Sequence, residues 1–104
     1  MEKVRINNDL LIKYTVLRDG QPEYFVGATD ITVTVTNEAY KKAIPNTFDI
    51  VGNIVNISID AADFNMCGKY RVTLKYVRGN DIEIDALAFE GVPYTSSTYI
   101  WYGN

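Results

Sequence analysis

Few side chains in this sequence could support acid–base, nucleophilic or metal chemistry. It contains no histidine, which is the usual general base near neutral pH and the commonest metal ligand. The one cysteine, Cys67, follows Met66 and has no histidine to activate it, so we predict a buried and inert thiol rather than a nucleophile. A single thiol forms no intrachain disulfide, and packing alone must hold the fold.

Acidic residues gather in two places. Asp60 and Asp63 could cap a turn, and with Asp81, Glu83 and Asp85 they could contribute to a calcium site. The Asp-x-Asp-x-Asp-Gly loop of a calcium-binding hand is absent from the sequence. Glu83 and Asp85 alternate along a predicted strand, where acidic side chains keep an edge soluble. We therefore expect these carboxylates to be structural and predict no bound metal.

The remaining catalytic signals have simpler explanations. A pair of glycosidase carboxylates works in a cleft that raises one of their pKa values, and a sandwich of about 100 residues offers no deep cleft. The sequence has no Gly-rich phosphate loop, because Gly79 and Gly103 belong to turns. The threonines within residues 31–36 form the solvated face of a strand. The sequence therefore predicts a protein that is not an enzyme and holds no cofactor.

Length and composition indicate one globular domain. The chain has 104 residues, of which 47% are hydrophobic and 22% are charged, so it can bury one core. Its net charge of −3 and scattered cations argue against nucleic acid and anionic membranes as partners. The sequence contains no apolar run of about 18 residues that would span a membrane. The first residues lack the apolar core of a signal peptide, so we expect synthesis in the cytoplasm.

Alternating apolar and polar residues predict an all-β chain, because a period of two is typical of half-buried strands. Turn residues separate the strands at intervals of about 8–12 residues. Residues 37–44 are predicted to be an irregular connection between sheets, since Pro45 stops the short helix that they could form. The predicted strands are residues 4–6, 10–17, 31–36, 47–51, 54–59, 70–77 and 82–89.

The stretch 53–77 contains the corner between two sheets. Asp60 begins a single helical turn that should return Phe64 to the core, and Gly68 releases the chain into the next strand. Gly68 and Tyr70 resemble the tyrosine corner of Greek-key sandwiches, in which the ring packs and the hydroxyl ties down the neighbouring loop. The side chains predicted to face inward are Val55, Ile57, Ile59, Tyr70, Val72, Leu74 and Tyr76.

The last predicted strand, residues 82–89, is apolar on one face and mixed on the other. The mixed face begins with two acids and ends with two large apolar side chains. An outward orientation of that face would leave an apolar patch beside the C-terminal tail, where another protein could bind. This assignment places Ile82, Ile84, Ala86 and Ala88 inside and Glu83, Asp85, Leu87 and Phe89 outside.

Together these features predict an immunoglobulin-like antiparallel β-sandwich of about seven strands with Greek-key connections. A parallel α/β fold would need amphipathic helices of about 10–15 residues between strands, and the sequence has none. Residues 1–90 are assigned to this sandwich. Residues 91–104 are assigned to a polar and aromatic tail, or to a linker, because the sequence after Glu90 carries no charge.

The tail has two parts. Residues 93–97 have the composition of a linker, whereas residues 99–102 are apolar and favour a strand. Three interpretations stay open: a last strand at a sheet edge, the start of a further module, or a segment that pairs with a partner. Exposed aromatics contact protein or sugar, and protein is favoured because sugar platforms need aromatics on rigid strands. The candidate interaction residues are Leu87, Phe89, Tyr94, Tyr99, Trp101 and Tyr102.

Five motifs follow one another over residues 9–77. They are Leu11-Ile12-Lys13-Tyr14, Asp19-Gly20-Gln21-Pro22, Val26-Gly27-Ala28-Thr29 leading to Ile31-Thr32-Val33, Asn53-Ile54-Val55-Asn56-Ile57, and Gly68-Lys69-Tyr70-Arg71-Val72. In this order they resemble the N-terminal immunoglobulin-like domain of phage baseplate upper proteins and related prophage tail modules. The ending departs from that family, because no long helical or β-rich continuation follows.

The resemblance implies a structural domain that anchors a larger protein to the virion. The expected function is therefore non-enzymatic assembly in a phage or prophage tail, through self-association or contact with a neighbouring tail protein. The expected location is a virion assembled in the bacterial cytoplasm. The alternative is a cell-surface module that binds a glycan or an adhesin-type partner, which would require an export signal in the full gene.

Overall fold

The computed structural model describes residues 1–93, which form ten strands and no helix. None of these residues therefore lies in a helix that could cross a membrane. The strands are β1 (Lys3–Arg5), β2 (Leu10–Thr15), β3 (Leu17–Arg18), β4 (Gln21–Pro22), β5 (Ala28–Asn37), β6 (Lys42–Ile44), β7 (Thr47–Val51), β8 (Ile54–Ile59), β9 (Gly68–Arg78) and β10 (Asp81–Val92). The prediction of an all-β chain is confirmed.

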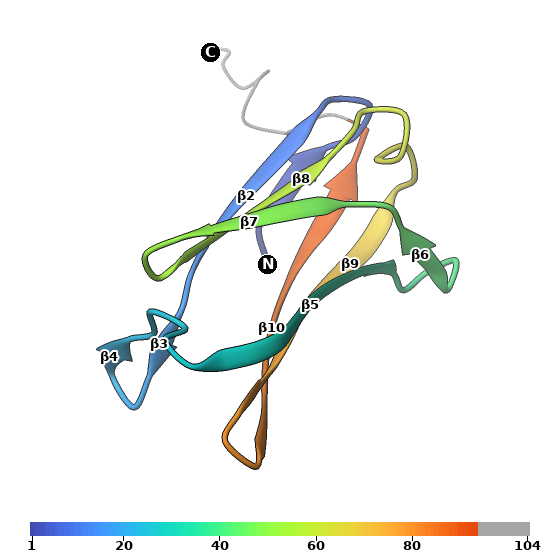
Figure 1. Ribbon diagram of the computed structural model, residues 1–104. Coiled ribbons are helices and arrows are strands. Elements are labelled where there is room, and N and C mark those ends of the chain that lie inside the picture. The colour runs from blue at the N-terminus through green and yellow to red at the C-terminus, as the bar shows by residue number, and fades with distance from the viewer. Residues whose placement is uncertain (94–104) are drawn as a thin grey trace.

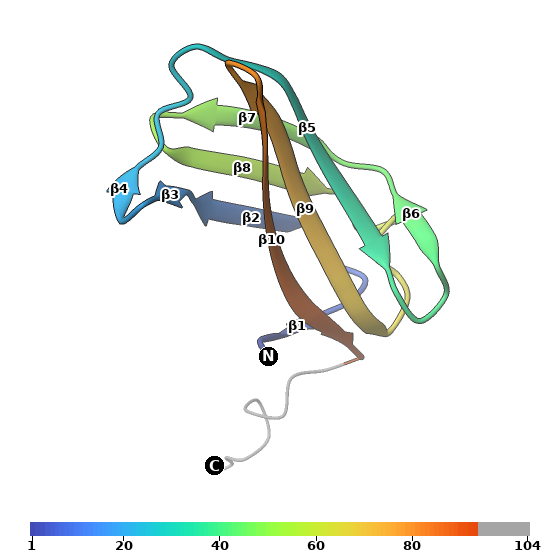
Figure 2. The same ribbon diagram turned by 90° about the horizontal axis from the view of Figure 1, so that it is seen from below.

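The strands form two main sheets and one small ribbon (Figure 1). The five-stranded sheet has the order β1-β10-β9-β5-β6, the three-stranded sheet has the order β2-β8-β7, and β3 pairs with β4. All neighbours pair antiparallel except β1, which runs parallel to the end of β10. The two main sheets face each other across the core (Figure 2).

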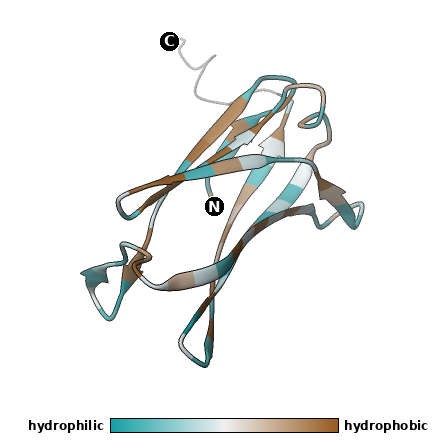
Figure 3. Cartoon of the chain, viewed as in Figure 1, coloured by the Kyte–Doolittle hydropathy of each residue, from teal (hydrophilic) through white to brown (hydrophobic). Residues whose placement is uncertain are grey.

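Alternate residues of β8 and β9 build the centre of this core, and hydropathy alternates along the strands accordingly (Figure 3). Phe64, in the turn between β8 and β9, is also fully buried. The inward faces predicted for these two strands are confirmed, because each of the side chains has 1% or less of its surface exposed: Val55, Ile57, Ile59, Tyr70, Val72, Leu74 and Tyr76.

Residues 37–44, predicted to be an irregular connection, form a hairpin instead. β5 continues to Asn37 and pairs with β6. The fully buried Asn37 side chain explains the turn, since its Oδ1 accepts the N–H of Tyr40 at 3.0 Å and its Nδ2 donates to the Cys67 carbonyl at 3.2 Å. Lys41 supplies a positive φ of 54°. A side-chain cap thus replaces the helix that Pro45 would have ended.

The facing predicted for the last strand is wrong. Phe89 of β10 lies opposite Tyr70 of β9, and residues directly opposite each other in an antiparallel pair point to the same face. Phe89 is accordingly 4% exposed, whereas Ile82 and Ile84 are 61% and 60% exposed. The pairing therefore turns Glu83, Asp85, Leu87 and Phe89 toward the interior and Ile82, Ile84, Ala86 and Ala88 toward the exterior.

The predicted tyrosine contact at the start of β9 is confirmed. The Tyr70 ring stacks on Phe89 with centroids 5.2 Å apart and planes 2° apart, and meets the edge of Phe64 at 5.1 Å. Its hydroxyl donates to the Met66 carbonyl at 2.6 Å. Gly68 is required beside it, because its φ is +112° and a Cβ there would lie 2.9 Å from the Ala39 Cβ.

Tyr70→Phe should lower the free energy of unfolding by about 1 kcal/mol, which is the net value of one hydrogen bond. The ring stays in place, so the loss isolates the bond to the Met66 carbonyl. Urea unfolding measures it. Tyr40→Phe is the matched control, because Tyr40 is 65% exposed, and its stability should not change. Equal stability of both variants and the wild type would contradict this role.

Candidate functional site

Two of the six candidate interaction residues, Leu87 and Phe89, lie in the part of the chain that the structure describes. Phe89 is buried in the core and Leu87 is half-buried against it, so the predicted exposed patch of these two side chains is wrong. The reason is the pairing of β10 with β9, which turns both side chains inward. β10 also continues past Glu90 to Val92. The other four candidates lie outside the described residues: Tyr94, Tyr99, Trp101 and Tyr102.

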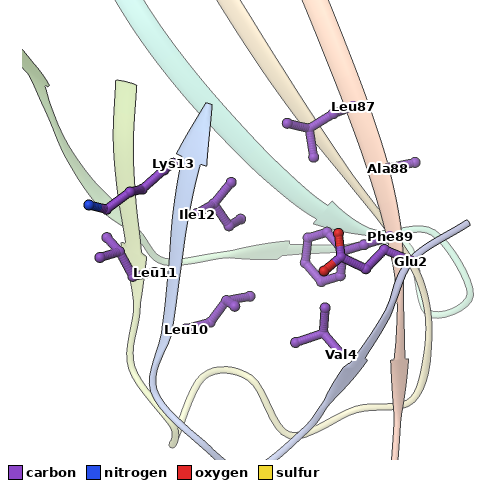
Figure 4. Close-up of a pocket in the computed structure, with 9 residues that line it drawn as sticks. All are labelled: Glu2, Val4, Leu10, Leu11, Ile12, Lys13, Leu87, Ala88 and Phe89. Atoms are coloured by element: carbon purple, nitrogen blue, oxygen red, sulfur yellow. The ribbon is translucent and has the colours of Figure 1, made fainter. Parts of the chain in front are cut away.

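Leu87 and Phe89 nevertheless line a groove of about 340 Å³ on the side of the molecule (Figure 4). Leu10 and Ile12 of β2 point toward them from the opposite wall, and Val4 of β1 lies at one end. We call this the lateral groove and define it by these five apolar residues. Sequence reasoning missed Val4, Leu10 and Ile12 as site residues, because β1 and β2 form the groove only when they meet β10, which lies more than 60 residues later in the chain.

The lateral groove lies between two sheet edges. β2 is an edge strand of the three-stranded sheet, and β1 is an edge strand of the five-stranded sheet. Val4, Leu10, Ile12 and Leu87 pack against the core and yet remain partly exposed. Glu2 and Lys13 are the charged residues at the groove. A concave apolar surface with charges at its margin is typical of a contact site.

A long open edge of β10 continues from the groove. β1 covers only residues 90–92 of β10, and within residues 1–93 no strand pairs with the same side of residues 81–89. The Glu90 N–H donates to the Glu2 carbonyl at 2.8 Å. Backbone groups alternate between the two sides of an antiparallel strand, so the N–H and C=O groups on this open side belong to Ile82, Ile84, Ala86 and Ala88.

The acids that β10 turns inward meet a cation. Arg18 Nη1 lies 2.9 Å from Glu83 Oε1, and its Nη2 lies 3.7 Å from Asp85 Oδ2. Arg18 Nε also donates to the Tyr76 hydroxyl at 3.0 Å. Burial raises the pKa of Tyr76, so the neutral phenol donates in turn to Glu23 Oε2 at 3.2 Å. Arg18 thus forms ion pairs with the carboxylates of Glu83 and Asp85.

Glu23 is the most buried acid of this group, with 8% of its surface exposed. Burial opposes its ionisation, but the Phe25 N–H donates to it at 2.7 Å and Arg78 Nη2 at 2.6 Å. The balance leaves the pKa of Glu23 below its ordinary value. Glu23 is thus a stable carboxylate anchored on both sides, and it ties the segment before β5 to the end of β9.

The acids considered for a calcium site are not brought together. Asp60 and Asp63 lie in the turn between β8 and β9. The other acids of that set lie on β10 opposite Leu74, Tyr76 and Arg78 of β9, at least six residues along β9 from Gly68, or about 20 Å. Within residues 1–93, no three His, Cys, Asp or Glu side chains are arranged to hold a metal.

Cys67 is exposed, so the predicted burial of its thiol is wrong. Phe64 and Tyr70 fill the core on either side of the corner. Cys67 lies midway between them in the sequence and turns outward, and its carbonyl accepts a hydrogen bond from the Asn37 amide.

Comparison with known proteins adds no relative. No protein-family model matches the sequence, and no curated protein matches it significantly. The contacts and edges described above are accordingly the basis for a functional proposal.

Acid should destabilise the protein through Glu23. Its pKa is lower in the folded protein than the ordinary 4.5, so its stabilisation is complete above that value and is lost as the pH falls through the folded pKa. We expect Glu23→Gln to lower the free energy of unfolding by about 1–3 kcal/mol at pH 7, since Arg78 loses a charged hydrogen-bond partner.

Urea unfolding of the wild type and of Glu23→Gln at pH 7 and at about pH 3 separates these effects. The difference between the two proteins should shrink at the lower pH. Asp19→Asn is the control, because Asp19 is an exposed acid in the β3–β4 turn. A gap between wild type and Glu23→Gln that is equally large at both pH values would contradict the assignment.

Proposed function

We propose that this protein is a non-enzymatic assembly module that joins other proteins by strand addition. The observation that carries the proposal is the open edge of β10 over residues 81–89, which adjoins the lateral groove. An extended segment of a partner would add one strand to the five-stranded sheet. Main-chain hydrogen bonds would supply affinity, and side-chain contacts beside the edge would supply specificity.

The side chains along this edge favour such pairing. Natural edge strands are protected by charges or proline, but the charged side chains of residues 81–89 that could shield the middle of the edge point inward to Arg18. Ile82 and Ile84 are exposed on the outer face instead. Covering each would contribute about 1–2 kcal/mol, since full burial of such a side chain is worth about 1.5–3 kcal/mol.

The proposed domain class is an immunoglobulin-like sandwich with Greek-key connections. The support is the pair of facing sheets, the crossing from β8 in one sheet to β9 in the other, and the Tyr70 hydroxyl bond beside that crossing. Together with the motif resemblance of residues 9–77, these features favour a structural role in a phage or prophage tail. The proposed partner is a second copy or a neighbouring tail protein.

Sugar binding at a cell surface is the alternative, and the described residues favour it less. Tyr24 and Tyr40 are the exposed tyrosines of residues 1–93, with 59% and 65% of their surface accessible. They lie beyond opposite ends of β5, whose ten residues extend for about 33 Å. Two rings so far apart do not form one platform for a sugar.

Ala86→Pro should disrupt assembly while preserving the fold. The Ala86 N–H points to the open side of β10, so proline removes a group that a partner strand needs and spares the bonds to β9. Sedimentation equilibrium of the full chain up to about 500 μM should show wild-type self-association that weakens at least about tenfold in this variant.

Ala86→Ser is the matched control, because serine keeps the N–H and adds only a hydroxyl on the exposed face. This variant should associate as the wild type does. Circular dichroism checks that all three proteins retain their strands. A chain that stays monomeric at every concentration, or a proline variant that associates normally, would contradict self-association through this edge.

A further inference from the structure

The lateral groove selects for an uncharged apolar occupant. Its floor is Phe89, and the half-buried side chains of Leu10, Ile12 and Leu87 converge on it (Figure 4). A charge placed among these apolar side chains would lose its hydration, which is costly unless the charge is paired. The volume of about 340 Å³ lies at the small end of the range for binding sites and suits one or two large side chains.

The chain itself contains a segment with this chemistry. Residues 94–104 carry no charged side chain, and residues 99–102 read Tyr-Ile-Trp-Tyr. Tyrosine and tryptophan bury about 150–250 Å² each and keep one polar group for the water side of a contact. These four residues therefore match both the apolar floor and the solvated margin of the lateral groove.

The chain leaves the five-stranded sheet next to the groove. β10 ends at Val92, and the preceding Gly91 pairs with Val4, which is itself a groove residue. Phe89 lies only three residues before the end of the strand, or about 10 Å. Residues 93–101 extend to about 26–29 Å. That length permits a reversal through residues 93–97 and still brings Trp101 to the groove.

Attachment to the same chain favours this occupant over a second copy. A segment joined to its binding site by a short stretch of chain is present there at an effective concentration in the millimolar range. A second copy would reach that concentration only in very concentrated solution. A segment of the same chain could thus bind at concentrations at which two chains rarely meet.

We propose that residues 99–102 of the same chain bind in the lateral groove, with Trp101 inserted between Ile12 and Leu87. The inference rests on the proposed function in one respect, because the groove adjoins the open edge of β10. A segment bound in the groove would limit the approach of a partner strand to that edge.

Trp101 is the only tryptophan of the chain, so tryptophan fluorescence reports on this segment alone. In the folded full chain at about 1 μM, its emission should be shifted to shorter wavelength than in urea, and acrylamide should quench it at least about threefold less. Ile12→Asp places a charge in the groove and should restore the emission and quenching of an exposed tryptophan.

Two further variants make the test specific. Thr15→Asp puts the same charge on the same strand at an exposed position, and it should leave the fluorescence unchanged. Leu87→Ala removes groove contacts without adding charge, and quenching should rise about twofold. Circular dichroism identifies variants that fail to fold, and Leu87→Ala decides the outcome if Ile12→Asp is one of them.

Two results would overturn the proposal. One is a Trp101 that is quenched equally in the folded wild type and in urea. The other is protection that appears only at concentrations at which the chain associates, since the occupant would then be a second copy. Protection that is constant from about 0.1 to 100 μM supports binding within one chain.

The two proposals fail in different ways. Ala86→Pro should weaken association and leave the Trp101 signal unchanged, because it alters the edge and not the groove. An exposed Trp101 in a chain that still associates through β10 would refute the groove contact alone. A protected Trp101 in a chain that never associates would refute assembly through the edge alone.

Discussion

The register of β9 against β10 is the constraint on which the rest of the structure depends. It is fixed where Tyr70 stacks on Phe89 with nearly parallel rings. Because a strand alternates strictly between its two faces, this one contact decides the direction of every other side chain in β10. It places Leu87 in the wall of the lateral groove, and it leaves Ile82 and Ile84 on the outer surface.

The same register explains the ion cluster. With Phe89 inside, Glu83 and Asp85 must also point toward the interior, where an unpaired carboxylate would be strongly disfavoured. Arg18 supplies the countercharge from β3, on the other side of the core. Removing one member of such a group costs more stability than forming the group provides, because the partner stays behind uncompensated. The cluster therefore fixes geometry more than it adds stability.

The sequence predicted the local pattern well and the choice of face poorly. The alternation of apolar and polar residues correctly predicted which side chains of β8 and β9 face inward, because only one face of each strand is mainly apolar. In β10 both faces are partly apolar, and a period of two does not say which face is inside. The hairpin after Asn37 depends on a buried amide bonded to a distant carbonyl. The lateral groove needs three strands to meet, which no local pattern encodes.

The parallel pairing of β1 with the end of β10 has a mechanical consequence. The Glu90 N–H donates to Glu2, and the Ile6 N–H donates to Val92, so the first strand is bonded beside the last one of the described chain. Tension applied between the start of β1 and the end of β10 would pull these strands past each other along their length. All of their hydrogen bonds would resist together rather than opening one by one.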